Sequence, residues 1–210
     1  MSVFTEFPLG ELPSPANVML IGLPGVSVVG RRVVDKILEV TKSTELLKTV
    51  PHFLPDILIA DEEGRPYLPG LDFYRSNKGD PTIVSVTSNF QIDLLPSPFS
   101  YWIAEYLVRK AKEFSCNKIA VLGTVLGKKT VIFYLASGEA FSPSIESLNL
   151  TPLQHRSIEG ISALVLPMSR FYKIPAIELA FQVTADGSAP PSLVNDGFSL
   201  LVRLLDLNIP

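Results

Sequence analysis

One stretch of the sequence predicts the fold class: Val18-Met19-Leu20-Ile21-Gly22-Leu23-Pro24-Gly25-Val26-Ser27-Val28-Val29-Gly30. It is typical of an apolar strand, a glycine-proline turn and the start of an amphipathic helix. A helix over 28–40 is predicted because apolar side chains recur on one face, namely Val29, Val33, Val34, Ile37 and Leu38. In an open α/β sheet such a junction lies at the carboxyl end of a strand, where these folds usually bind ligands or partners.

The composition indicates one globular domain, 1–210. The chain has 210 residues, of which 47% are hydrophobic and 19% charged, so it can bury a substantial core. Its mean hydropathy of +0.31 is high, yet no run approaches the roughly 18 uncharged apolar residues of a membrane span. We therefore expect a parallel sheet buried on both faces, together with apolar contacts between subunits.

Charge and cysteine content predict a cytoplasmic protein without a nucleic-acid or membrane partner. The net charge is −3, and no basic block is present. Residues 1–12 lack the basic start of a signal peptide. The single cysteine, Cys116, excludes an internal disulfide and is consistent with a reducing compartment.

The remaining pattern predicts an α/β chain with a β-meander insertion. Four short β-like runs follow the first helix, at 57–61, 65–68, 71–75 and 81–87, and the last of them returns to the main sheet. Further strands are predicted at 118–123, 130–136 and 175–181, and helices at 98–114, 160–172 and 191–205. Pro167 is expected to kink the second of these helices or to end its first half. The predicted fold is a single domain with a mostly parallel sheet flanked by helices.

The glycine-proline loop matches neither common nucleotide-binding motif. Pro24 stands where a dinucleotide fingerprint has its second glycine, and Gly30 is followed by Arg31 rather than by the lysine of a phosphate loop. Its backbone amides could still face an anion at the helix start, or the turn could serve close packing or a partner contact. The run 123–130 is a second near-match, which we interpret as a loop with a basic tip.

A polar segment, Thr87-Ser88-Asn89-Phe90-Gln91, directly follows a predicted strand. If that strand neighbours the first one, these side chains face the glycine-proline loop and could hydrogen-bond a ligand or a partner's backbone. Capping and turn formation by the same side chains is the alternative. The resulting candidate partner or ligand surface comprises Gly22, Leu23, Pro24, Gly25, Gly30, Thr87, Ser88, Asn89 and Gln91.

The sequence offers no catalytic constellation. His52 and His155 are distant in sequence, and Cys116 is expected to be a small buried side chain. No histidine, cysteine or carboxylate pair has metal-ligand spacing, so no catalytic, cofactor-binding or metal residue is assigned. Glu178 lies within a predicted strand, where it either finds a partner in a central strand or lies at an edge or interface.

Several segments together resemble the proteasome assembly chaperone 2 family, in its archaeal-type members. Residues 21–30 are similar to the family's G-x-P-G-V-G-x-V-G signature, and 87–91 to its polar segment ending in glutamine. Residues 160–166 are similar to its G-x-S-G-L-L-L helix, and 174–179 to its G-I-P-A-x-x-L strand. The matches run in order from residue 21 to the closing helix.

The resemblance implies a single α/β domain similar in fold to nucleoside phosphorylases, self-association, and a role in proteasome assembly. Several members end in a hydrophobic-tyrosine-any tripeptide that inserts between proteasome subunits. This chain ends in Asn208-Ile209-Pro210, which argues against such a tail but leaves chaperoning through another surface open. Ser27 stands where the family has its third glycine. Its side chain restricts how closely a ligand or partner can approach the loop.

Two functions follow as hypotheses. The first is a non-enzymatic assembly chaperone or binding protein that acts on proteasome or related subunits. The alternative is a small-ligand enzyme or sensor of nucleoside-phosphorylase-like ancestry that uses the Gly22–Gly30 loop, which would need a general acid or base that the sequence lacks. We favour the first, because it requires only a shaped apolar surface.

Two structural expectations accompany these hypotheses. The first strand should be central, with burial of Val18, Leu20, Ile119, Val121, Ile177 and Leu179. The chain should form a homo-oligomer whose apolar contacts include Phe90, Phe99, Tyr101 or Trp102.

Overall fold

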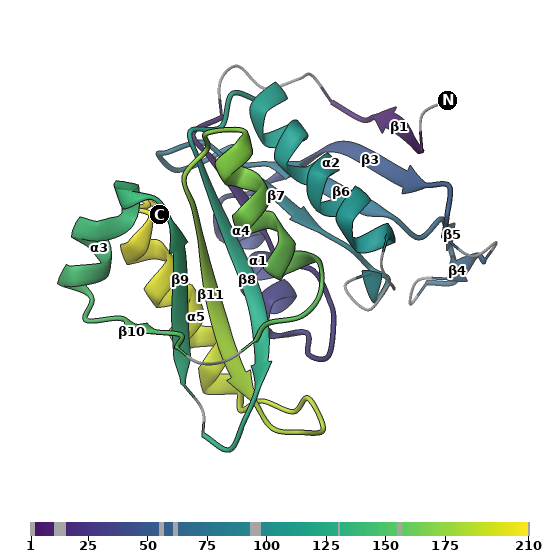
Figure 1. The fold of residues 1–210 in the computed structure, drawn as a ribbon. Helices are drawn as coiled ribbons and strands as arrows, with labels where there is room; N and C mark the ends of the chain where they lie inside the picture. Colours follow the sequence, from purple (N-terminus) through teal and green to yellow (C-terminus); the bar gives the residue numbers. More distant parts are fainter. Residues whose placement is uncertain are drawn as a thin grey trace.

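A computed structural model describes residues 3–10, 16–54, 57–60, 63–92, 98–129, 131–154 and 157–209. Strands and helices alternate through most of this part of the chain (Figure 1). In chain order the elements are β1 Phe4–Pro8, β2 Val18–Ile21, α1 Val29–Val40, β3 Thr44–Pro51, β4 Ile59–Ala60, β5 Pro66–Tyr67, β6 Leu71–Arg75, β7 Ile83–Thr87, α2 Phe99–Glu113, β8 Lys118–Leu126, β9 Ile132–Ser137, η2 Glu139–Phe141, α3 Ser142–Ser147, β10 Thr151–Pro152, α4 Ile161–Phe171, β11 Ala176–Val183 and α5 Pro191–Leu204.

The described strands form one large mixed sheet and a separate small hairpin. The large sheet has the order β1-β3-β6-β7-β2-β8-β11-β9-β10, and β4 pairs with β5. Its centre, β7-β2-β8-β11, is parallel, whereas the pairs β1-β3, β3-β6, β6-β7 and β11-β9 are antiparallel. The predicted α/β class is confirmed, and β2 is central as expected.

Helices cover both faces of the parallel centre, as Figure 1 shows. Alternate residues of β2 divide between the two layers: Met19 and Ile21 join the core under α2 and α4, and Val18 and Leu20 join the core under α1 and α5. Burial on both faces explains why these strands are continuous apolar runs. The six core residues predicted from the sequence are all at most 2% exposed. No described helix is long and apolar enough to cross a membrane.

Three local predictions are corrected by the structure. Helix α4 continues through Pro167, so the expected end of the helix at this proline is wrong, whereas the expected kink stays a prediction; the proline lies on the exposed side of the helix. Strand β8 extends to Leu126, because β11 pairs with it as far as that residue. Of the loop predicted over 123–130, residues 123–126 therefore belong to the strand, and 127–129 lie outside it. Strands β1 and β3 lie in segments for which no strand was predicted.

The five described α-helices end in the same way. After each one comes a residue with left-handed backbone that is not glycine, and the next residue donates a hydrogen bond back to the carbonyl five positions earlier, as in a Schellman motif. The left-handed residues are Lys42, Ser115, Asn149, Lys173 and Asp206, with φ between 49° and 58°.

Candidate functional site

The structure brings the glycine-proline loop and the polar segment together. Strands β2 and β7 are parallel neighbours, so both segments emerge at the same carboxyl edge of the sheet. The Gly22 N–H donates to the Val86 carbonyl at 3.0 Å, and the Gln91 side-chain amide donates to the Gly25 carbonyl at 3.4 Å. Neighbouring strand ends therefore fix the loop and the segment against each other.

The glycines of the loop allow α1 to pack closely on the sheet. A Cβ atom at Gly22 would lie 2.5 Å from Val34 Cγ2 and 2.7 Å from the Gly30 carbonyl oxygen. A Cβ atom at Gly30 would lie 2.4 Å from the Leu122 carbonyl oxygen in β8. In addition, the Arg31 guanidinium donates to the Ser88 carbonyl at 2.8 Å. The strand-turn-helix junction is thus a tightly packed unit.

Most of the predicted site residues contribute little accessible surface. Gly22, Leu23, Pro24, Gly25, Gly30, Thr87 and Ser88 are buried, Asn89 is half-buried and Gln91 is exposed. Within the loop, the apolar side chains that reach solvent are Val26, 48% exposed, and Val28, 39% exposed. Within the described part of the chain, Thr87 Oγ1 and Asn89 Oδ1 have no hydrogen-bond partner. We call Val26, Val28, Asn89 and Gln91 the carboxyl-edge surface.

Of the other residues singled out in the sequence, those that the structure describes do not converge on this surface. The Cys116 thiol is buried, and desolvation raises its pKa to about 12, which makes it a poor nucleophile. The His52 ring lies 2.6 Å from the Thr5 hydroxyl at an exposed position, and His155 falls outside the described residues. Among the described residues, no group of three or more potential metal ligands is present.

Glu178 occupies an interior strand of the sheet, so of the two locations left open by the sequence the edge location is excluded. It is 1% exposed in β11, between β8 and β9. A Cβ atom at Gly123 would lie 1.9 Å from Glu178 Oε1 and 3.2 Å from Ser162 Oγ at the start of α4. Glycine in β8 therefore makes the space in which this carboxylate lies.

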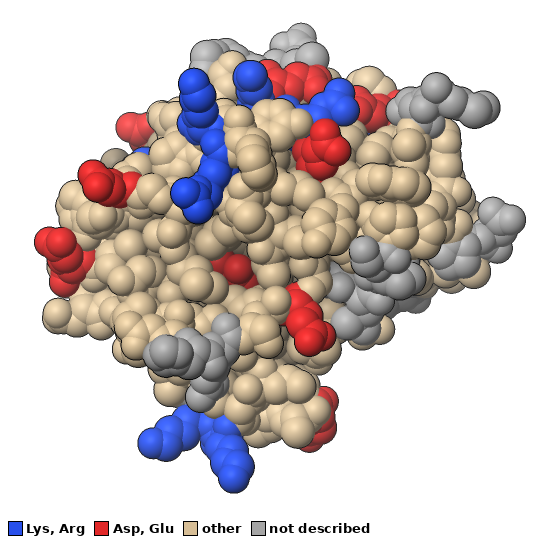
Figure 2. All heavy atoms as spheres, viewed as in Figure 1, with Lys and Arg blue, Asp and Glu red and all other residues tan. Residues whose placement is uncertain are grey.

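A second feature, which we call the aromatic surface, comprises Phe53, Phe99, Tyr101 and Trp102. The Phe53 and Phe99 rings stack at a centroid distance of 4.7 Å, and Trp102 lies 5.6 Å from Phe99 and 5.7 Å from Phe53. Tyr101 is 50% and Trp102 41% exposed. Figure 2 shows mainly uncharged atoms over the start of α2. Aromatic side chains in such a setting are typical of protein–protein contacts.

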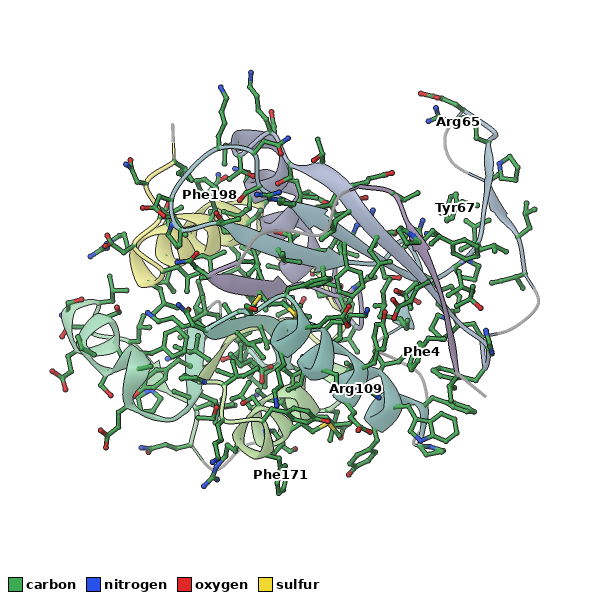
Figure 3. All side chains as sticks on the ribbon, turned by 90° about the horizontal axis from the view of Figure 1, so that it is seen from above. Phe4, Arg65, Tyr67, Arg109, Phe171 and Phe198 are labelled. Carbon is green, nitrogen blue, oxygen red and sulfur yellow. The ribbon has the colours of Figure 1, made fainter. Side chains whose placement is uncertain are left out.

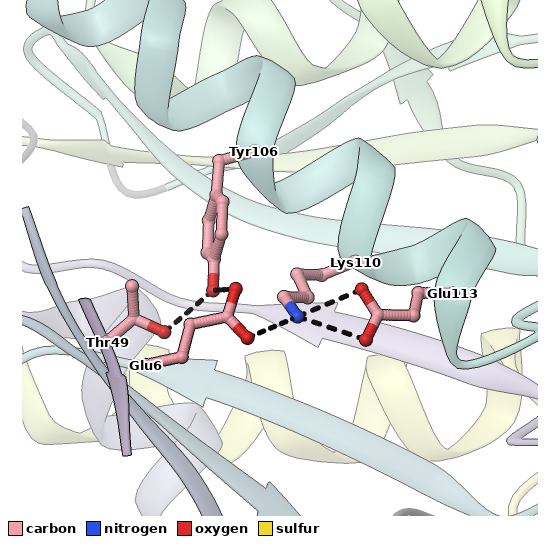
Figure 4. Close-up of polar contacts among 5 residues, drawn as sticks. All are labelled: Glu6, Thr49, Tyr106, Lys110 and Glu113. Carbon is pink, nitrogen blue, oxygen red and sulfur yellow. Dashed lines mark hydrogen bonds and ion pairs between the residues drawn. The ribbon is translucent and has the colours of Figure 1, made fainter. Parts of the chain in front are cut away.

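A partly buried polar network links α2, the helix that carries Phe99, Tyr101 and Trp102, to β1 and β3 (Figure 4). The Tyr106 hydroxyl donates to Glu6 Oε1 at 2.9 Å and lies 2.7 Å from Thr49 Oγ1. Lys110, only 5% exposed, pairs with Glu6 at 2.8 Å and with Glu113 at 2.9 Å. Burial is the main cause of a strongly raised Tyr106 pKa, so its hydroxyl stays protonated. The network ties β1 to α2 and β3.

Sequence reasoning missed this network. Glu6 and Lys110 lie 104 positions apart, and neither belongs to a recognisable motif. The only available signal was the apolar face of the predicted helix 98–114, onto which a lysine falls between Tyr106 and Phe114.

Comparison with solved structures finds the same fold in proteins of low sequence identity. A Pyrococcus furiosus protein, PbaB, described as an archaeal proteasome activator, is 15% identical with a TM-score of 0.85, covering 100% of this chain and 92% of its own. P. furiosus PbaA, described as an archaeal homologue of proteasome-assembly chaperone, is 22% identical with a TM-score of 0.76, covering 99% and 88%. A Mycobacterium tuberculosis proteasome-assembly chaperone homologue is 12% identical with a TM-score of 0.68, covering 92% and 87%.

The expected similarity to nucleoside phosphorylases stays a prediction. The comparison with curated proteins found no match. The comparison with family models, in contrast, matches residues 19–210 to the PAC2 family, a span that includes the glycine-proline loop, the polar segment and the strand of Glu178. This chain therefore belongs to the PAC2 family.

Proposed function

We propose that this chain is a non-enzymatic assembly chaperone or binding protein that acts on proteasome subunits or related subunits in the cytoplasm. Membership of the PAC2 family and the likeness in fold to proteins described as a proteasome activator and as assembly-chaperone homologues support a proteasome-related role. The low cysteine content supports a reducing compartment.

The carboxyl-edge surface is the proposed subunit-binding surface, and one observation carries the proposal. A loop held in place by neighbouring strand ends presents two exposed valines beside two amide side chains. Exposed valine supplies apolar contact area, and the side-chain amide of the exposed Gln91 can form a hydrogen bond with a partner's backbone. Such a surface suits binding rather than chemistry.

Capture of 20S α-subunits from the same source organism tests this proposal. The immobilised chain is expected to retain the subunits, and the double variant Val26→Asp with Val28→Asp should weaken capture by at least about tenfold, because it places charge in an apolar contact. A matched control, Leu58→Asp with Leu68→Asp, adds the same charge at two exposed leucines elsewhere on the surface and should leave capture unchanged.

Two results would overturn the proposal. Failure of the wild-type chain to retain any proteasome subunit contradicts the function, and equal losses in both double variants contradict the assignment of the surface. A melting temperature raised by inorganic phosphate or by a nucleoside, and no longer raised in the Val26 and Val28 variant, would support the small-ligand alternative instead. Thermal unfolding monitored by circular dichroism establishes that each variant is folded.

A further inference from the structure

A groove at the amino edge of the parallel strands lies opposite the carboxyl-edge surface. It has a volume of about 540 Å³, and six of its lining residues are Ser137, Gly138, Arg170, Lys173, Ile174 and Pro175. These residues come from the end of β9, the end of α4 and the segment leading into β11. The groove has the size of a typical binding cavity and combines apolar lining with two cations.

The walls of the groove are fixed to each other by hydrogen bonds. The Ser137 hydroxyl accepts from the Ala176 N–H at 3.1 Å and lies 3.0 Å from the hydroxyl of Ser169, which is fully buried. The Ser169 hydroxyl in turn donates to the Leu166 carbonyl at 2.7 Å. A Cβ atom at Gly138 would meet nothing within 4 Å, so the groove is open above this residue.

Cations from two helices gather at this end of the molecule. Lys and Arg side chains lie around the end of α4 in Figure 2. Arg170 lies in the last turn of α4 and Lys173 follows the helix, and the Lys112 ammonium of α2 lies 6.0 Å from the Tyr172 ring centroid. Arg109 acts on the same ring: the Tyr172 pKa is raised by desolvation first and by Glu105 next, and Arg109 partly offsets this rise.

These four cations lack anionic partners in the part of the chain that the structure describes. The described ion pairs, within 4.0 Å, include none of Arg109, Lys112, Arg170 and Lys173. Cations near the carboxyl end of a helix are favoured by its dipole, which explains their presence but not the open groove beside them. The whole chain has a net charge of −3, so the cluster of cations at this end does not reflect an excess of basic residues in the chain.

A large apolar side chain stands beside these cations. Phe171, next to Arg170 in the chain, is 84% exposed, the highest exposure among the exposed large hydrophobic residues described. In Figure 3 it projects from α4 away from the body of the molecule, near the helix that carries Arg109. A small anion would pair with the cations but would leave the Phe171 ring in water. A polypeptide can pair with the cations and also cover the ring.

We propose that the groove and Phe171 together bind an acidic polypeptide segment that also carries an apolar side chain. Carboxylates of the segment pair with Arg170 and Lys173, and its apolar residue covers the Phe171 ring. This inference goes beyond the proposed function, because it uses neither the carboxyl-edge surface nor a proteasome subunit.

Binding of a fluorescein-labelled octapeptide, EEFEELEE, to the full chain tests the inference by fluorescence anisotropy. We expect saturable binding at about 50 mM salt that weakens as salt is added, because exposed charge pairs are screened. The double variant Arg170→Glu with Lys173→Glu should bind about tenfold more weakly, because two attractions become repulsions. The basic peptide KKFKKLKK should not bind the wild-type chain.

The matched control is Lys128→Glu with Lys129→Glu. It makes the same change in net charge at the turn after β8, on the opposite edge of the sheet, where the side chains of both lysines are exposed. The control variant should bind EEFEELEE as the wild-type chain does. Equal weakening in both double variants would mean that the peptide responds only to net charge, and this result, like absence of wild-type binding, overturns the inference.

The variant Phe171→Ala tests the apolar part separately. It should weaken binding of EEFEELEE about threefold to tenfold, because one ring contact is lost, while binding of octaglutamate stays unchanged. Equal effects on the two peptides would contradict a role for the Phe171 ring. Since synthetic peptides are the probes, a failure of subunit capture leaves this experiment unaffected.

Discussion

Ser115 follows α2 with a φ of 57°, a backbone conformation that costs a side-chain-bearing residue free energy and glycine very little. The hydroxyl of this exposed residue makes no hydrogen bond to the described residues that the substitution would remove. Ser115→Gly should therefore raise the free energy of unfolding by about 0.5–1 kcal/mol, net of the greater freedom of the unfolded chain. Urea denaturation followed by circular dichroism measures the change.

Arg109→Gly is the control for this prediction. Arg109 is exposed inside the same helix, where glycine should lower the free energy of unfolding by about 1 kcal/mol. If both glycines destabilise the protein alike, the left-handed position carries no special cost, and the explanation of the helix ends is wrong.

Tyr106 supplies a second prediction about a single residue. Its hydroxyl lies between Thr49, which is fully buried, and Glu6. Tyr106→Phe removes a hydrogen-bond partner from both, so the free energy of unfolding should fall by about 1–2 kcal/mol. Tyr134→Phe is the control: Tyr134 is half-buried and its hydroxyl makes no hydrogen bond among the described residues, so it should change stability by less than about 0.5 kcal/mol. A loss no larger at Tyr106 than at Tyr134 would contradict the network's role.

The contact between α1 and β8 gives a prediction about an element. In Gly30→Ala the new Cβ would lie 2.4 Å from the Leu122 carbonyl oxygen and 3.1 Å from Leu122 Cβ, so α1 must move away from the sheet. Overpacking of this kind should lower the free energy of unfolding by about 2 kcal/mol or more, although alanine is otherwise the better helix former. Arg32→Ala, at an exposed position two residues further along α1, should be nearly neutral. A stabilised Gly30→Ala protein would contradict the close packing that defines the junction.

Helices and strands with a regular pattern of hydrophobic residues were predictable from the sequence. A strand whose pattern is interrupted by its pairing with a neighbouring strand was not. Strands β2, β8 and β11 are rich in apolar residues because both of their faces are buried, and α1 has a regular apolar face. Strand β3, in contrast, buries the adjacent residues Leu46 and Leu47, and its register with β6 shifts at that point. A β-bulge breaks the alternation on which sequence reasoning depends.

The candidate site was predictable in its position but not in its accessibility. Two strand ends followed by turn residues were sufficient to place the loop and the polar segment near each other. Whether Leu23 or Ser88 reaches solvent depends on how α1 packs on the sheet. This packing cannot be predicted from the residues of the loop alone. The exposed Val26 and Val28, which carry the proposed surface, were quoted in the loop but not singled out.

At the scale of the whole molecule, we predict self-association through the aromatic surface. Burial of Tyr101 and Trp102 against a second copy removes exposed apolar area from water, whereas Phe90, another expected contact, packs partly buried against the chain's own core. Sedimentation at micromolar concentration should give a mass above the 23.0 kDa of one chain, and Tyr101→Ala with Trp102→Ala should shift it toward that value. Leu126→Ala, at an exposed residue on another part of the surface, should not.

Either of two results would contradict this prediction. A wild-type monomer at all concentrations argues against self-association. An oligomer unchanged in the Tyr101 and Trp102 variant assigns the contact to another surface.

The attachment of β1 has a consequence for biosynthesis. Glu6 emerges from the ribosome 104 residues before Lys110, which at ordinary rates of translation is a delay of roughly 5–20 s. During that time the β1 segment, with Phe7 and Leu9 exposed even in the finished fold, has no helix α2 to which it can bind. Nascent chains would be most vulnerable to premature association during this interval, and Glu6 and Pro8, a charge and a residue without an N–H donor, are the side chains within β1 that oppose it.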